Sequence, residues 1–128
     1  MNKRIIIIAS IFGILAVVLG AFGAHGLKTI ISEAQLNTWE TAVQYQFYHT
    51  LALLFLATFS RFKSRAINAA SWFFTFGILL FSGSLYLLSL KDYLNITDTA
   101  VLGPVTPIGG VFFILGWVSL LVATVKNK

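Results

Sequence analysis

Two histidines and several amide and hydroxyl side chains are the residues best able to do chemistry, because they interrupt or flank long apolar runs. His49 closely follows Gln44 and Gln46, and an imidazole can bind a metal ion, transfer a proton or form hydrogen bonds. On a helix Gln46 and His49 share one face, so both are expected to point into a helical bundle. A polar group surrounded by lipid needs a partner. His49 is therefore either part of a site or one member of an interhelical hydrogen bond.

Depth along the helices predicts which polar groups can meet. We count about 1.5 Å per residue from the basic residue at the end of each run. By this count His25 lies about 31 Å above Arg4, and His49 lies only about 18 Å above Arg61. This gap of about 13 Å argues against one metal ion or haem held by both histidines, whose ligands must lie nearly level. The other polar groups reach a height near that of His25, so an outer polar layer is expected. The candidate polar pocket consists of His25, Gln44, Gln46, His49, Ser84, Tyr86 and Thr106.

Catalysis is not expected from these residues. The spans contain no carboxylate and no cysteine, and no nucleophile with a neighbouring base and acid can be recognised. No phosphate-binding loop or zinc-ligand spacing is present. We therefore expect no metal, no cofactor and no enzymatic activity.

Four apolar runs must position the polar groups. With 58% hydrophobic residues, 10% charged residues and a mean hydropathy of +0.88, the 128-residue chain is far more apolar than a soluble domain. Each run is close to the roughly 20 residues that cross a bilayer, and the alternation of barrel strands is absent. The prediction is an all-α integral membrane four-helix bundle. It forms a single transmembrane domain over residues 1–128, with helices at about 5–24, 33–60, 66–90 and 107–125.

Local signals refine the outer ends of these helices. Ser32 and Gln35 have the spacing of a capping box, so the second helix is expected to begin before the membrane. Trp39 would then lie at the outer interface, where aromatic residues anchor helices. The segment from Lys91 to Thr106 contains glycine and proline and is expected to be irregular.

Basic residues predict the orientation. The side that would hold both termini carries Lys3, Arg4, Arg61, Lys63, Arg65, Lys126 and Lys128, whereas the other side carries only Lys28 and Lys91. This split of seven to two predicts that both termini are cytoplasmic. The net charge of +5 is thus a topology signal, and nucleic acid is not expected as a partner. A cleaved signal peptide is the less favoured alternative, because its removal would spoil the charge asymmetry.

Small residues recur four apart in the first helix, at Ala16, Gly20 and Ala24. Such spacing lets two helices approach closely. The helices that meet there belong either to two copies in a homo-oligomer or, as we favour, to one bundle.

Longer motifs resemble a known family. The string Gly20-Ala21-Phe22-Gly23-Ala24-His25-Gly26-Leu27 is similar to the signature of the YgdD/YwdK family of small bacterial inner-membrane proteins, which has a eukaryotic transmembrane relative. Its motif residues here are Gly20, Gly23, His25 and Gly26. Supporting strings are Tyr45-Gln46-Phe47-Tyr48-His49, Gly83-Ser84-Leu85-Tyr86, Pro107-Ile108-Gly109-Gly110 and Gly116-Trp117. The resemblance implies a compact four-helix protein of the bacterial plasma membrane, and it implies no activity.

Three functions are compatible with these features. The first is the binding of a lipid or another amphipathic ligand in an outward-facing polar pocket. The second is an accessory or assembly subunit that contacts a membrane-protein partner through its helices. A small transporter or channel ranks last, because the inner half of the spans offers few polar residues.

Overall fold

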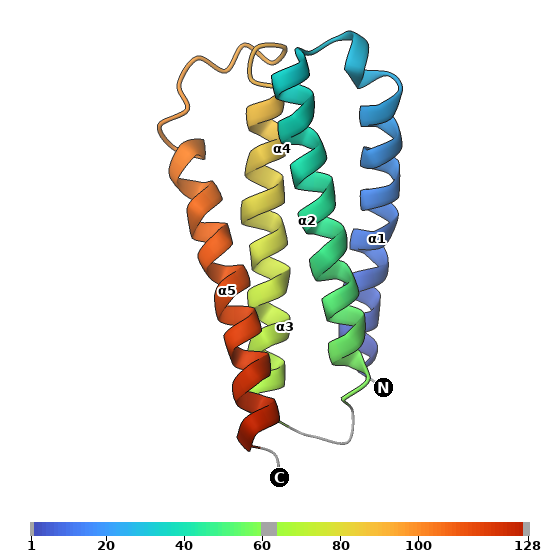
Figure 1. Ribbon diagram of the computed structural model, residues 1–128, viewed down its shortest axis with the longest axis vertical. Helices are drawn as coiled ribbons and strands as arrows, with labels where there is room; N and C mark the ends of the chain where they lie inside the picture. The colour runs from blue at the N-terminus through green and yellow to red at the C-terminus, as the bar shows by residue number, and fades with distance from the viewer. Residues whose placement is uncertain (1, 60–63, 127–128) are drawn as a thin grey trace.

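The computed structural model describes residues 2–59 and 64–126, and these residues form four helical rods that lie side by side (Figure 1). The described part of the chain contains no strand, so the all-helical prediction is confirmed. The start of the first rod and the end of the last lie at the same end of the bundle. In chain order the elements are α1 (Lys3–Ala24), η1 (Leu27–Thr29), α2 (Glu33–Ala57), α3 (Arg65–Gly77), η2 (Ile78–Ser82), α4 (Gly83–Ser89) and α5 (Leu102–Lys126).

Side chains cap three of the helices at their first turns. Asn2 accepts a hydrogen bond from the Ile5 amide, and Ser64 accepts one from the Ala66 amide. At the start of α2 the Ser32 hydroxyl accepts from the Gln35 amide, and the Gln35 side chain accepts from the Ser32 amide. The predicted capping box is therefore confirmed.

Two helix boundaries differ from the prediction. α2 ends at Ala57 and not at residue 60, which lies outside the described residues. α5 begins at Leu102 and not at 107, although Pro104 and Pro107 follow its start. Pro104 lies in the first turn, where a backbone N–H has no helical partner to lose. Pro107 comes one turn later and removes a single bond near the helix end.

The third rod is one continuous helix with a π-helical turn, η2, in its middle. It lies between α2 and α5, while α1 packs mainly on the far side of α2 (Figure 1). All four rods contribute to the apolar core. Its most buried large side chains are Ile5, Leu53, Leu56, Phe74 and Ile78.

Large apolar side chains also cover the outside of the bundle. Ile14, Ile114 and Leu121 are each more than 60% exposed, as expected for a surface that lipid covers. Three rods are long and apolar enough to cross a membrane, namely Lys3–Thr29, Arg65–Ser89 and Leu102–Lys126. α2 has 25 residues, but its polar side chains lower its hydropathy, and Gln46 and His49 among them are buried. The protein is an integral membrane four-helix bundle.

Candidate functional site

His49 lies on the buried face of α2 and uses both of its ring nitrogens. Its Nδ1 lies 2.8 Å from the Tyr45 carbonyl oxygen, and Trp117 Nε1 of α5 donates to His49 Nε2 at 3.1 Å. An indole N–H can only donate, so Nε2 accepts and the ring hydrogen sits on Nδ1. The imidazole is therefore neutral in this arrangement. No lone pair remains for a metal ion, and the described residues contain no group of three metal-ligating side chains.

Aromatic rings hold the His49 imidazole in place. Phe113 of α5 stacks on it with a centroid distance of 3.6 Å and an interplanar angle of 8°. Phe113 also fills the space beside Gly77 of α3, while Phe74 of α3 fills the space beside Gly116 of α5. A side chain at either glycine would meet the opposing ring at about 2.5 Å, too close for any real contact. The two glycines thus let α3 and α5 approach each other.

A cavity of about 470 Å³ opens beside this histidine, between α2 and α5. Its lining is mostly apolar, and two of its polar groups, the His49 imidazole and the Trp117 indole, are bonded to each other. Its walls reach the outer surface of the bundle at Tyr45, Ile114 and Trp117, which are 38%, 62% and 47% exposed. The lining consists of Tyr45, His49, Phe81, Pro107, Gly110, Val111, Phe113, Ile114 and Trp117.

Gln46 forms a second set of interhelical bonds, toward α1 and α4. Its amide nitrogen donates to the Phe12 carbonyl of α1 at 2.8 Å, and its oxygen accepts from the Tyr86 hydroxyl of α4 at 2.7 Å. The Ser82 hydroxyl of η2 donates to the Ala42 carbonyl at 2.8 Å. These bonds join three rods and saturate the Gln46 amide oxygen and one of its hydrogens.

The structure brings some residues of the predicted polar pocket into contact. Ser84 and Thr106 bond to each other at 2.6 Å, and Tyr86 bonds to Gln46. His25 and Gln44 are exposed. Gln44 lines a smaller cavity of about 210 Å³ between α1 and α2, whereas His25, Ser84, Tyr86 and Thr106 line neither this cavity nor the one beside His49. Mutual pairing is what a structural role predicts for Ser84, Tyr86 and Thr106.

Two glycines of the Gly20-to-Leu27 string, Gly20 and Gly23, serve the packing of α1 on α2. The Trp39 ring lies directly against Gly23, where an added Cβ would come within 2.7 Å of it, and Trp39 Nε1 donates to the Leu19 carbonyl. Trp39 is only 3% exposed, so its ring packs inside the bundle between α1 and α2. Gly20 packs on Val43, and Ala16 is fully buried. These small residues pack within one bundle.

Sequence reasoning missed the partner of His49. An interhelical hydrogen bond was one of the two roles expected of His49, but its donor, Trp117, was not among the candidate pocket residues. Depth counting could have found it, because Trp117 lies nine residues before Lys126 and so about 14 Å above it, close to the height of His49. An indole N–H surrounded by lipid also needs an acceptor.

Known proteins with similar sequences place the chain in a family. Residues 19–110 match the family model described as "Protein of unknown function (DUF423)". A UPF0382 membrane protein of Staphylococcus aureus (strain bovine RF122 / ET3-1) is 48% identical over 124 residues, which cover 97% of each chain. The UPF0382 membrane protein YwdK of Bacillus subtilis (strain 168) is 45% identical over 126 residues, which cover 97% of this chain and 98% of its own. The chain belongs to the UPF0382 family. No solved structure matches it.

The resemblance to the YgdD/YwdK family is confirmed by these UPF0382 relatives. They are named as membrane proteins, in agreement with the apolar surface of the bundle. Their names and the family description state no activity, so the function of this UPF0382 protein has to be argued from its own residues.

Proposed function

We propose that this UPF0382 protein binds the apolar chain of an amphipathic molecule, such as a membrane lipid or a quinone, in the cavity between α2 and α5. The observation that carries the proposal is the cavity of about 470 Å³ beside His49. Its volume is in the range of pockets that hold small molecules. Because its walls reach the lipid-covered surface at Ile114 and Trp117, a ligand can enter from the bilayer.

The lining of this cavity suits the apolar chain of an amphipathic molecule. Phe81, Phe113 and Trp117 present aromatic surface, and Gly110 leaves space where a longer side chain would fill the cavity. The site proposed from the sequence was a polar pocket formed by the outer layer. We now place the ligand in this apolar cavity, because Ser84 and Thr106 are bonded to each other.

Binding fits the site better than catalysis does. Both nitrogens of His49 are engaged, so the imidazole has no free position for proton transfer or nucleophilic attack. The inner hydroxyls of Ser71 and Thr75 bond to carbonyls of their own helix, which gives little support to a polar transport path.

The orientation that we propose is the one predicted by the basic residues. Both termini lie in the cytoplasm, and the protein crosses the bacterial plasma membrane several times. The cavity beside His49 would then extend from the middle of the membrane toward its outer side, since its lining on α5 runs from Trp117 back to Pro107, near the start of that helix at Leu102.

The test compares two glycine variants of the full chain. A Cβ at Gly110 would lie 3.9 Å from the Phe81 ring, so Gly110→Leu should fill the cavity without straining the backbone. Gly83→Leu is the matched control, because nothing lies within 4 Å of its added Cβ. Each protein is purified in a mild detergent, and the molecules that remain bound are extracted and identified by mass spectrometry.

The wild-type protein and Gly83→Leu are expected to retain the same amphipathic molecule, and Gly110→Leu is expected to lose most of it. Equal retention by the two variants would show that the ligand does not occupy this cavity. If the wild-type protein retained nothing beyond the bulk lipids in bulk proportions, the proposal would be wrong.

An accessory or assembly subunit is the second candidate. Ile7, Ile11, Ile14 and Val18 form one stripe on α1 and are each at least 50% exposed, so a membrane-protein partner or a second copy could cover them. Charged substitutions do not test this stripe, because they would also disturb insertion. A cysteine introduced at position 11 or 14 that forms a crosslink to another chain in membranes would favour this function. The absence of such a crosslink would favour ligand binding.

A further inference from the structure

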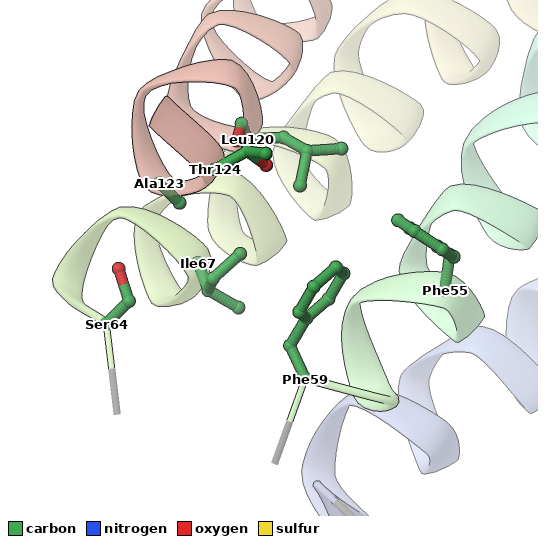
Figure 2. Close-up of a pocket in the computed structure, with 7 residues that line it drawn as sticks. All are labelled: Phe55, Phe59, Ser64, Ile67, Leu120, Ala123 and Thr124. Carbon is green, nitrogen blue, oxygen red and sulfur yellow. Dashed lines mark hydrogen bonds between the residues drawn. The ribbon is translucent and has the colours of Figure 1, made fainter. Parts of the chain in front are cut away.

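A second cavity beside α5 lies at the opposite end of the bundle from η1, where α2 and α5 end and α3 begins (Figure 2). Its volume is about 320 Å³. Figure 2 shows Phe55 and Phe59 on one side of the cavity and Ile67 and Leu120 on the other. The remaining lining residues are Ala123 and the two hydroxyl residues Ser64 and Thr124. An apolar interior with hydroxyl groups on its wall suits an amphipathic molecule.

Positive charge borders this cavity. Arg65 directly follows the lining residue Ser64. Lys126 comes three residues after the lining residue Ala123, which places both on one side of α5. Both basic residues are exposed. Arg4, by contrast, is engaged, because it donates to Asn68 and Ser71.

The acidic side chains lie at the other end of the protein. The acidic residues of the chain are Glu33 and Glu40 in the first half of α2 and Asp92 and Asp98 between α4 and α5. At about 1.5 Å per residue, about 26 Å or more of helix separates these side chains from the end that holds Lys126, the shortest path being the one from Glu40 to the end of α2 at Ala57. No acidic side chain of the protein can therefore neutralise Arg65 or Lys126 in this bundle.

We propose that this second cavity holds an acyl chain of an anionic phospholipid whose headgroup is bound by Arg65 and Lys126. The charge of the site selects the lipid, because two unneutralised cations next to an apolar cavity complement a headgroup with net negative charge better than a zwitterionic one. The hydroxyls of Ser64 and Thr124 lie on the cavity wall close to these cations, at the level expected of the headgroup and ester groups. The site is distinct from the cavity beside His49, with which it shares no lining residue.

The experiment measures lipid binding to the full chain by native mass spectrometry in a neutral detergent. Dioleoyl phosphatidylglycerol and dioleoyl phosphatidylcholine are titrated separately, because they share their acyl chains and differ in headgroup charge. Each surface Lys or Arg contributes about a fivefold gain in affinity, so the wild-type protein should prefer phosphatidylglycerol by about 30-fold. The double variant Arg65→Gln/Lys126→Gln should bind the two lipids with similar affinities.

A matched charge control and a cavity-filling variant complete the design. Lys28→Gln/Lys91→Gln removes the same charge at the other end and should retain the preference. Thr124→Phe fills the cavity from an exposed position and should weaken the binding of both lipids, whereas Gly110→Leu should weaken neither. Lys126→Gln alone, at the end of α5, gives a milder test if the double variant does not purify as a folded protein; it should reduce the preference about fivefold.

Three results would overturn the proposal. The first is a wild-type protein with no preference for phosphatidylglycerol, and the second is an equal loss of preference in the two double variants. The third is unchanged binding of both lipids by Thr124→Phe. Because Gly110→Leu tests the other cavity, failure of the function proposed above leaves this result unaffected, and the reverse also holds.

Discussion

The His49 imidazole accepts one hydrogen bond from Trp117 and donates one to the Tyr45 carbonyl, so each ring nitrogen has one partner. A second hydrogen on the ring would place two donors, Nε2 of His49 and Nε1 of Trp117, against each other. At the scale of single residues, the most unusual polar groups of the chain thus appear as donor and acceptor pairs. Gln46 and Tyr86 are a second such pair.

A double-mutant cycle should detect the bond between His49 and Trp117. Combining His49→Phe with Trp117→Phe should reveal a coupling of about 0.6 to 1.7 kcal/mol in the free energy of unfolding, the range of interhelical hydrogen bonds in membranes. Unfolding is followed by circular dichroism while sodium dodecyl sulfate is titrated into the micelles. The same cycle with Trp72→Phe should give no coupling, since Trp72 contacts Arg4 and Phe76 instead. A coupling near zero for Trp117 would mean that the bond does not form.

Tyr86→Phe should lower the free energy of unfolding by about 0.5 to 2 kcal/mol, because the Gln46 oxygen loses its donor. Tyr48→Phe is the matched control, since Tyr48 lies in the same part of the bundle and is 54% exposed. It should change the unfolding free energy very little in the same titration. Equal effects of the two substitutions would argue against a buried bond at Tyr86.

At the scale of the helices, α5 approaches the third rod at its π-helical turn. A Cβ on Gly109 would collide with the backbone nitrogen of Phe81, which belongs to η2. Gly110, one residue further along α5, faces the cavity beside His49 instead. Gly109 therefore lets α5 approach the third rod, and Gly110 leaves space between α5 and α2.

Gly109→Ala should destabilise the protein by about 1 to 3 kcal/mol, because the backbone of η2 cannot yield as a side chain could. Gly110→Ala provides the control, because its Cβ would lie 3.9 Å from Phe81, an ordinary contact distance. Alanine also favours a helix over glycine, so this variant should be neutral or slightly stabilised. The measurement is again the free energy of unfolding in micelles. Similar values for the two variants would contradict the close approach at Gly109.

At the scale of the whole molecule, charge is divided between the two ends. Of the described basic residues, Lys3, Arg4, Arg65 and Lys126 lie at one end. Lys28, Lys91 and the four acidic residues lie at the other, where Asp92 accepts a hydrogen bond from Gln35. This division predicts the orientation of the bundle in the membrane, and the second cavity lies at its basic end.

Cysteine labelling in intact cells tests the orientation. The chain has no cysteine of its own, so single cysteines can be introduced directly. Cysteines at 28, 91 and 98 should react with a membrane-impermeant maleimide added outside, and those at 63 and 126 should react only after lysis. Position 63 lies outside the described residues, so position 126 provides the structural reference. The reverse pattern would invert the proposed topology.

The sequence alone determined the helical membrane fold. Lipid offers the backbone no hydrogen-bond partner, so an apolar run of about 20 residues without the alternation of barrel strands must form a helix. It also determined the capped start of α2 at Ser32 and the burial of Gln46 and His49, which follow from local geometry and from the cost of an unpaired polar group in lipid. The start of α5 was placed five residues too late, because prolines near a helix start were read as its boundary.

Only the tertiary structure decided which groups pair and where space remains. Depth counting gave the height of each polar residue but not its direction around the helix, so the exposed His25 and Gln44 were grouped with the hydrogen-bonded Ser84, Tyr86 and Thr106. The partnership of His49 with Trp117 and the two cavities beside α5 depend on how closely α5 approaches α3. That distance is set by contacts of Gly77, Gly109 and Gly116 with rings and backbone far away in the chain, which no local pattern specifies.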